Sequence, residues 1–291
     1  MKNLKILFFI SFFNIIAKSE VGYGTFPLKG NDCIQAIEHA IKLGYRIIDS
    51  ATRYGNLDAI GTAIAKFNRN DLFIISKVWP DSYAPEALRK DLFATLEKLK
   101  TGYLDNYLLH WPYSKVAIEP TLHEMQELKT QGLIRTIGLS NPTVNHMKRA
   151  LQCGVKIDYV QIEMHPEFCD FQLLKFCNKN SIRVQAWAPL GVGRLSRDPF
   201  LLNIGKKYNK TAAQVALRWI VQHNCIPLPA SKNVAHMQEN IDIENFALSK
   251  QEMNLINRKA RSGKRQRFTF KDPVEFADEF DFSFEECWPI K

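Results

Sequence analysis

Short apolar runs in this chain end, one after another, in side chains that can carry out chemistry. RIID ends in Asp49, LFIISK in Lys77 and NYLLH in His110, while IRTIGL leads to Ser140 and YVQI contains Gln161. When parallel strands close into a barrel, their C-terminal ends open on one face, and groups from different strands meet there. The pattern therefore predicts a βα-barrel with a catalytic site on that face.

The remainder of the chain supports this fold class. From Val21 onward, strand-like and helix-like segments alternate in cycles of about 25 to 35 residues. The strand candidates are VGYGT, YRIID, LFIISK, DNYLLH, IRTIGL, YVQIEM, RVQAW and CIPLP. Eight apolar strands separated by helices favour a parallel sheet that is covered on both faces. Because the first turn lacks a G-x-G-x-x-G sequence, we expect an α/β fold of the closed (β/α)8 TIM-barrel type rather than a doubly wound sheet.

The two ends of the chain differ in composition from the middle. We expect a single barrel domain over residues 20–272, and a C-terminal tail, residues 273–291, that extends over the barrel mouth. Residues 1–19 combine a basic start, an apolar run and the small-x-small sequence Ala17-Lys18-Ser19. They form either a secretory signal peptide or an N-terminal hairpin that covers the barrel floor. No run is long enough for a membrane-spanning helix, so we expect no membrane partner.

The cysteine pattern bears on metals and on location. The cysteines are scattered, at Cys33, Cys153, Cys169, Cys177, Cys225 and Cys287. They form no C-x-x-C pair and no Cys/His spacing typical of a metal site, so we expect no metal. They are also too sparse for a disulfide scaffold, and reduced thiols indicate a cytoplasmic protein. Export, which a signal peptide would direct, stays open as the alternative.

The formal net charge of +9 indicates an anionic partner. A nucleic acid, a membrane surface or a phosphate-bearing cofactor each fits such a charge. Much of the excess lies in one late stretch, from Arg258 to Arg267. Without interleaved aromatic residues or a known motif, this stretch is typical of a solvated surface loop, and we expect no nucleic-acid partner. The competing hypothesis of nucleic-acid binding predicts a steep salt dependence.

Three motifs, GYRIIDSATRYGN, FIISKVW and YLLHWP, together resemble the aldo-keto reductase family, in the family's order and spacing. The resemblance extends from Val21 to about Asp272 and points to the microbial-type aldehyde and keto reductases. It implies the family's (β/α)8 barrel, in agreement with the strand count. It also implies a catalytic tetrad, which consists of Asp49, Tyr54, Lys77 and His110.

These residue types suit the reduction of a carbonyl group. A carbonyl that accepts hydride becomes an alkoxide, so an acid must supply a proton. Tyr54 is that acid in this interpretation, although a phenol has an unperturbed pKa near ~10. We expect Lys77 to lower that pKa and Asp49 to hold Lys77 in place. His110 orients and polarises the substrate oxygen. In the alternative interpretation, the Asp49–Lys77 pair is structural and His110 is simply packed.

The resemblance further implies a nicotinamide cofactor, NADPH, with NADH accepted less efficiently. The residues implied at its nicotinamide and pyrophosphate are Ser140, Asn141, Gln161, Trp187, Leu190 and Gly191. The hydroxyl and amide groups among them can read the donor and the acceptor of a carboxamide together. Trp187 has the family's ring-stacking position, and Leu190 with Gly191 follows in the loop along the pyrophosphate. Core packing is the alternative role for Trp187.

The segment LPASKNVAHMQEN departs from the family signature that grips the 2′-phosphate of NADP(H). The lysine and the arginine of that signature are Ala230 and His236 in this chain. Lys232 follows the retained serine and can supply part of the missing charge, so we expect a weakened preference for NADPH. The residues implied at this end of the cofactor are Ser231, Lys232, His236, Glu239 and Asn240.

The substrate pocket implied by the resemblance is aromatic, with Trp79, Trp111 and Trp288 in its wall. Ordinary packing is the alternative role for these large side chains. We expect a monomer that reduces small or medium aldehydes and ketones, including keto sugars, by direct hydride transfer. The competing hypothesis is a nicotinamide-binding regulatory or structural module without turnover.

Overall fold

The computed structural model describes residues 21–113 and 115–262. Within this part of the chain, the strands form one eight-stranded sheet in which sequence order and spatial order coincide. Every neighbouring pair is parallel. The strands are Tyr23–Gly24 (β1), Ile47–Asp49 (β2), Phe73–Val78 (β3), Leu104–Leu109 (β4), Ile134–Ser140 (β5), Tyr159–Glu163 (β6), Arg183–Trp187 (β7) and Cys225–Pro227 (β8). Each coincides with a segment that the sequence predicts as a strand, to within two residues at either end.

The sheet closes on itself between its first and last strands. The backbone N–H of Gly22 donates to the oxygen of Pro227, and that of Gly24 donates to the oxygen of Pro229, both at 2.9 Å. A Cβ atom on Gly22 would lie 2.5 Å from the Leu228 side chain, and one on Gly24 would lie 2.8 Å from the Leu228 carbonyl oxygen. Glycine at both positions therefore permits this close approach. The prediction of a (β/α)8 barrel is confirmed.

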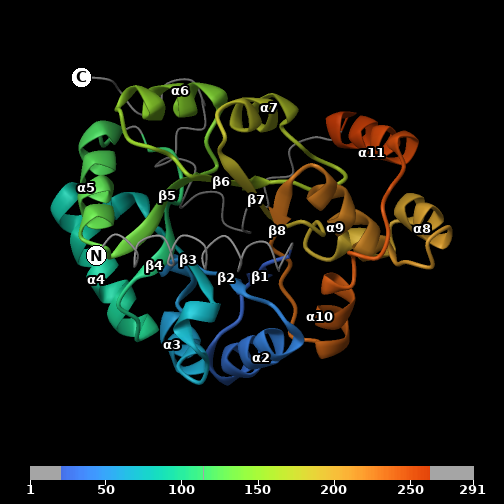
Figure 1. Ribbon diagram of the computed structural model, residues 1–291, viewed down its shortest axis with the longest axis horizontal. Coiled ribbons are helices and arrows are strands. Elements are labelled where there is room, and N and C mark those ends of the chain that lie inside the picture. The colour runs from blue at the N-terminus through green and yellow to red at the C-terminus, as the bar shows by residue number, and fades with distance from the viewer. Residues whose placement is uncertain (1–20, 114, 263–291) are drawn as a thin grey trace, which may run out of the picture.

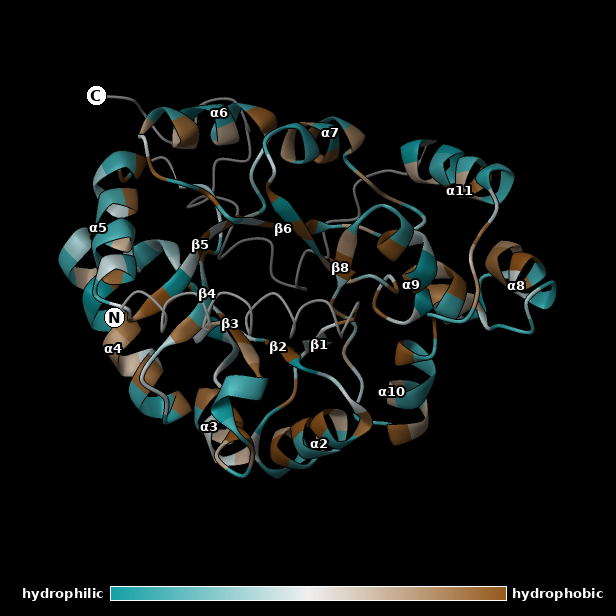
Figure 2. Cartoon of the chain, viewed as in Figure 1, coloured by the Kyte–Doolittle hydropathy of each residue, from teal (hydrophilic) through white to brown (hydrophobic). Residues whose placement is uncertain are grey.

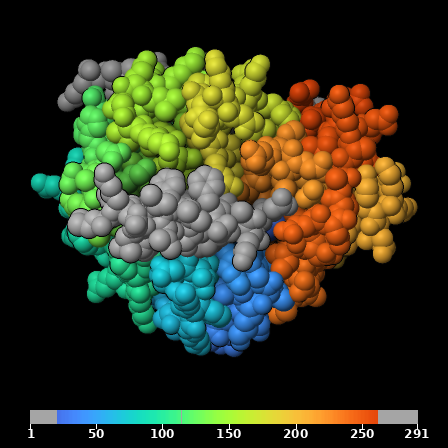
Figure 3. Space-filling model, viewed as in Figure 1, coloured from blue at the N-terminus to red at the C-terminus, as the bar shows by residue number. Residues whose placement is uncertain are grey.

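Helices surround the barrel on its outside (Figure 1). They are Gly30–Leu43 (α2), Leu57–Ile64 (α3), Pro85–Leu99 (α4), Ile118–Thr130 (α5), Val144–Gln152 (α6), Phe171–Lys179 (α7), Pro199–Lys206 (α8), Ala212–Gln222 (α9), Val234–Ile241 (α10) and Lys250–Ser262 (α11). Blue α2 and orange α10 lie side by side (Figures 1 and 3), and beside them the Tyr45 hydroxyl donates to the Met237 carbonyl at 2.9 Å. The helical ring therefore closes at the same place as the sheet.

Helix α9 illustrates how local sequence produces these elements. It begins with a capping box, in which the Thr211 hydroxyl accepts from the Gln214 N–H and the Gln214 side chain accepts from the Thr211 N–H. Apolar residues at helical spacing, such as Ala216 and Ile220, are buried against the barrel. Figure 2 shows brown and teal residues on different sides of the surrounding helices, as expected when one side packs inward.

The interior of the barrel places the candidate site. An apolar cluster fills its lower part, and its members are Ile47, Phe73, Ile75, Leu108, Tyr159, Ile226 and Leu228. Successive side chains of a strand point to opposite faces, so residues two positions apart share the interior face. Two positions beyond Ile47, Ile75 and Leu108 come Asp49, Lys77 and His110. The apolar floor therefore gives way to polar side chains at the C-terminal ends of the strands.

Several sequence-based predictions lie outside the described residues. These are the signal peptide or hairpin at residues 1–19, the barrel end at residue 272, and the tail at residues 273–291 with Trp288. Among the residues that are described, no helix has both the length and the apolar character needed to cross a bilayer. The cysteines of the described part, Cys33, Cys153, Cys169, Cys177 and Cys225, are free thiols.

The contact between α3 and α4 yields a test of the packing. A Cβ atom on Gly61 would lie 2.2 Å from the Lys98 backbone oxygen, which cannot move without shifting α4. We expect Gly61→Ala to lower the free energy of unfolding by about 1 to 3 kcal/mol, measured by urea denaturation. Gly102→Ala is the matched control, since a Cβ there meets nothing within 4 Å. Equal stability of the two variants would contradict this packing.

Candidate active site

A buried ion pair lies at the centre of the site. The Lys77 ammonium, from the end of β3, donates to Asp49 Oδ2 at 2.9 Å and to the Ser50 backbone oxygen at 2.8 Å. Both side chains are almost completely buried. The same ammonium donates to the Tyr54 hydroxyl at 3.3 Å. The ends of β2 and β3 thus bring Asp49, Lys77 and Tyr54 together, as the sequence predicts.

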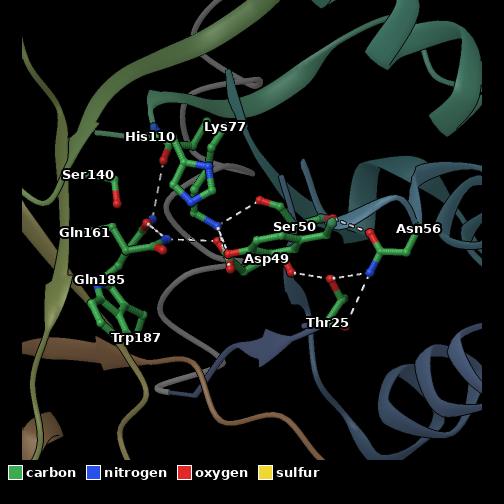
Figure 4. Close-up of polar contacts among 12 residues, drawn as sticks. Thr25, Asp49, Ser50, Asn56, Lys77, His110, Ser140, Gln161, Gln185 and Trp187 are labelled. Carbon is green, nitrogen blue, oxygen red and sulfur yellow. Dashed lines mark hydrogen bonds and ion pairs between the residues drawn. The ribbon is translucent and has the colours of Figure 1, made fainter. Parts of the chain in front are cut away.

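A chain of buried amides supports Asp49 from the other side of the barrel (Figure 4). The Gln161 amide nitrogen donates to Asp49 Oδ1 at 2.8 Å and to Gln185 Oε1 at 3.0 Å. Gln185 in turn donates to Asn106 Oδ1 at 3.5 Å, and Asn106 donates to the Thr136 hydroxyl at 3.0 Å. The two Asp49 oxygens are therefore held by different partners, which fixes the plane of the carboxylate.

The loop that carries Tyr54 is fastened by polar contacts of its own. Tyr54 ends a short 3-10 helix, Thr52–Tyr54, that follows β2. Two residues later, Asn56 Oδ1 accepts from the Ser50 hydroxyl at 2.8 Å, while its amide donates to the Thr25 hydroxyl at 3.1 Å. Figure 4 shows this group on the opposite side of Asp49 from Gln161. The half-buried phenol is thereby kept beside Lys77.

The charges in the site set its protonation states. Burial raises the pKa of the Tyr54 phenol above its ordinary value, and the attraction of Lys77 only reduces this rise. Burial lowers the pKa of Lys77, but Asp49 and Tyr54 outweigh it and the net pKa is raised. Lys77 does lower the Tyr54 pKa, as expected, but removal from water has the larger effect on the phenolate, so the net pKa lies above its ordinary value. Both groups therefore keep their protons at neutral pH.

His110 faces Tyr54 across the site. The two ring centroids are 5.8 Å apart, edge to face, and the Trp79 ring lies 5.0 Å from His110 on another side. Burial, followed by the charge of Lys77, holds the pKa of His110 well below its ordinary value. The ring is therefore neutral at pH 7 and offers one N–H donor. Within the described residues, its buried Nδ1 atom has no hydrogen-bond partner.

A second set of hydrogen-bonded side chains lies next to His110, at the ends of β5 and β7. Asn141 follows β5 in a left-handed conformation (φ 60°), and its amide donates to the His110 oxygen at 3.0 Å and to the Ser140 hydroxyl at 3.1 Å. The indole N–H of Trp187 donates to Asn141 Oδ1 at 2.9 Å. These contacts place Ser140, Asn141 and Trp187 beside the tetrad, together with Gln161.

The other predicted cofactor residues lie farther along the chain, after β7 and β8. Leu190 and Gly191 belong to the loop after β7, where Gly191 is left-handed (φ 57°). Ser231 and Lys232 follow β8 and are at least partly exposed, and Lys232 lies 3.3 Å from Asp32 of α2. The remaining members lie on α10: His236 is exposed, Glu239 accepts from the Thr211 hydroxyl at 2.5 Å, and Asn240 is buried.

Of the tryptophans predicted in the pocket wall, Trp79 and Trp111 lie within the described residues, and both are near His110. Trp79 contacts it directly, whereas Trp111 follows it in sequence and exchanges backbone hydrogen bonds with the Tyr83 hydroxyl. In the described ranges, no group of three or more His, Cys, Asp or Glu residues is arranged to hold a metal ion.

Some residues of the site escaped the sequence analysis. Gln185 and Asn106 support Asp49 indirectly, Phe26 packs 5.1 Å from the Tyr54 ring, and the Arg53 guanidinium lies 5.3 Å from the Trp79 ring. The signal for Gln185 was available, because it lies on the interior face two positions before Trp187. Because Arg53 directly precedes Tyr54, the sequence placed it near the site, but the sequence did not show where its side chain points.

Comparison with known proteins shows the family of this chain. The model of the Aldo/keto reductase family matches residues 20–261. The chain is 37% identical over 240 residues to the glyoxal reductase of Bacillus subtilis (strain 168), covering 81% of this chain and 87% of that relative. The chain belongs to the aldo/keto reductase family.

Other relatives extend the comparison to further members of the family. The methylglyoxal reductase DkgA of Escherichia coli (strain K12) is 34% identical over 254 residues, covering 84% of this chain and 90% of that relative. The solved structure of the aldose reductase from Schistosoma japonicum matches with a TM-score of 0.82 at 32% identity, over 93% of this chain and 94% of that one. The chain is therefore an oxidoreductase, as the sequence predicts.

The protonation state of His110 can be measured without substrate. Because its pKa is lowered, it takes up a proton only at a pH well below the ordinary histidine range. We expect its ring signals in NMR spectra to stay constant between pH about 7.5 and about 5.5, where exposed histidines titrate. The variant His110→Gln identifies the signals. A midpoint near the ordinary value would contradict the burial described here.

Proposed function

We propose that this aldo/keto reductase reduces aldehydes or ketones to alcohols with NADPH, using Tyr54 as the general acid. The observation that carries the proposal is the contact between the Tyr54 hydroxyl and the Lys77 ammonium, above the buried pair with Asp49. A cytoplasmic location and a monomeric state accompany it as predictions. The assembly of Tyr54, Lys77 and His110 around one point favours an enzyme over a binding module without turnover.

The roles follow from the protonation states. Tyr54 has a raised pKa, so its hydroxyl carries a proton that it can donate to a developing alkoxide. Lys77 stabilises the phenolate that remains, because it keeps its own positive charge throughout. Neutral His110 donates a hydrogen bond to the carbonyl oxygen and so orients it. Asp49 holds Lys77 in place, and Gln161 in turn holds Asp49, so the ammonium stays beside the phenol during this proton transfer.

The donors and acceptors of the site fit a nicotinamide carboxamide. Both hydrogens of the Gln161 amide are used, by Asp49 and Gln185, so its carbonyl oxygen is the group that it offers. The Ser140 hydroxyl accepts a bond from Asn141 and keeps its own proton to donate. One acceptor and one donor complement the amino group and the oxygen of a carboxamide. When bound, NADPH supplies the hydride, and the Trp187 ring, fixed by Asn141, provides a stacking surface.

Removal of the acid tests this mechanism. Tyr54→Phe deletes one hydroxyl and keeps the ring, so the fold and NADPH binding should persist. Loss of a positioned acid lowers kcat by about 10²- to 10⁴-fold, measured with a good aldehyde substrate, while NADPH affinity from fluorescence titration changes little. Turnover of Tyr54→Phe within a few-fold of the unsubstituted protein would refute the assignment.

Lys77→Met extends the same test. It removes the positive charge that opposes the rise of the Tyr54 pKa, so that pKa should rise further. It also leaves Asp49 buried without its cation, which is strongly destabilising. The dependence of kcat on pH, measured for any residual activity, should therefore differ from that of the unsubstituted protein.

The cofactor preference tests the other end of the site. Lys232 supplies positive charge where the family signature's lysine is absent, but the Asp32 carboxylate lies 3.3 Å from it and competes for that charge. We expect kcat/KM to favour NADPH over NADH by only about 5- to 30-fold. Lys232→Ala should reduce this ratio, and Asp32→Asn should increase it. Equal or better kcat/KM with NADH would contradict the proposal.

A further inference from the structure

We propose that the C-terminal half of the barrel steers the phosphate-bearing end of the cofactor to its site by long-range electrostatic attraction. This role rests on the proposed function, from which it takes NADPH as the anion, and it adds how the cofactor approaches the protein. The surface concerned belongs to residues 171–262, which run from α7 to α11 and are termed the basic half.

The charge of the chain is divided unevenly. Residues 171–262 contain 14 lysines and arginines but only 5 aspartates and glutamates, which gives a net charge of +9. Residues 21–170, the neutral half, contain 17 of each sign. The segments outside the described residues, 1–20 and 263–291, contribute +2 and −2. The net charge of the whole protein, +9, therefore equals that of the basic half.

The positive side chains of the basic half lie mostly on its surface. Eleven of the 14 are exposed, among them Lys175 on α7, Lys206 on α8 and Arg258 on α11. The yellow, orange and red segments that carry them gather on one side of the molecule, away from α3 and α4 (Figures 1 and 3). Because cations outnumber carboxylates almost three to one there, ion pairs within the basic half cannot cancel its charge.

The residues proposed at the phosphates of the cofactor all belong to the basic half. Leu190 and Gly191 follow β7, and Ser231 and Lys232 follow β8. The catalytic tetrad, by contrast, belongs to the neutral half. NADPH has a matching asymmetry, because its charges are on its phosphates and the reduced nicotinamide ring is uncharged. Attraction by the basic half therefore draws the cofactor in and also turns its phosphates toward the correct side.

The attraction is collective. Two exposed charges interact weakly in water, and their interaction is screened over about 10 Å at an ionic strength of about 0.1 M. An excess of one sign over a whole surface can nevertheless raise an association rate constant by about 10- to 10³-fold at low ionic strength. Since steering acts before contacts form, it changes the association rate constant and leaves the dissociation rate constant nearly unchanged.

The test neutralises three exposed residues of the basic half that belong to none of the proposed cofactor contacts. The triple variant combines Lys175→Gln, Lys206→Gln and Arg258→Gln. Stopped-flow mixing with NADPH, without any carbonyl substrate, gives both rate constants from the change in tryptophan fluorescence. At an ionic strength of about 0.02 M, we expect the association rate constant to fall by about 3- to 5-fold and the dissociation rate constant to stay within about twofold.

A matched control removes the same charge from the neutral half. It combines Lys90→Gln and Lys98→Gln on α4 with Lys148→Gln on α6, all at exposed positions. Its association rate constant should fall by less than about 1.5-fold, because these charges lie outside the basic half. At about 0.5 M salt, all three proteins should share one association rate constant, since screening removes the attraction. NADH, with one phosphate fewer, should show a weaker dependence on salt than NADPH.

The outcomes separate this role from the proposed function. Equal association rate constants for the triple variant and the matched control would overturn the steering role, as would a change confined to the dissociation rate constant. Either result leaves the proposed function intact when carbonyl compounds are still reduced. Steered binding of NADPH by a protein that reduces no aldehyde or ketone would support the role of the basic half and refute the proposed reduction. A protein that binds no NADPH would contradict both.

Discussion

Moving an ammonium and a carboxylate out of water costs several kcal/mol for each ion, and this cost is offset only when both are fully hydrogen-bonded. Lys77 and Asp49 meet that condition through partners from several strands. The ammonium also binds the Ser50 carbonyl, and the second Asp49 oxygen accepts from Gln161. The arrangement of the site follows from this requirement, because the strands that supply the partners must all end at the same level of the barrel.

The same ammonium acts in opposite directions on its two titratable neighbours. It favours the charged form of Tyr54 and disfavours the charged form of His110. Burial opposes it at the phenol and reinforces it at the imidazole. As a result, the tyrosine keeps a proton to give and the histidine stays neutral, although both lie within one buried site. Burial outweighs the cation at the phenol and acts with it at the imidazole, which leaves both groups neutral, one as proton donor and the other as positioning group.

The strand ends were predictable because the parallel strands of a barrel are short apolar runs with a change to polar residues at one end. Asp49, Lys77 and His110 could be placed by that pattern alone, and Tyr54 by the motif. The partners across the barrel could not be placed in this way, since Gln161 and Asp49 meet over a separation of 112 residues. The net direction of the Tyr54 pKa was also out of reach, because it depends on how much water the folded loop excludes. Arg53 shows the same limit: its position beside Tyr54 was visible, but its contact with Trp79 depends on the turn of a 3-10 helix.

The closure of the barrel between its first and last strands has a consequence for how the protein acquires activity. Contacts such as Tyr45 with Met237 join positions 192 residues apart, and the entropy lost in closing such loops must be spent before the contacts form. Folds dominated by pairings of this kind tend to fold slowly. A chain in which only neighbouring elements have formed has an incomplete active site, because Asp49 and Lys77 can meet while Asp49 still lacks Gln161. The appearance of catalysis during refolding therefore reports the joining of distant segments, and it should lag behind the signals of helix formation.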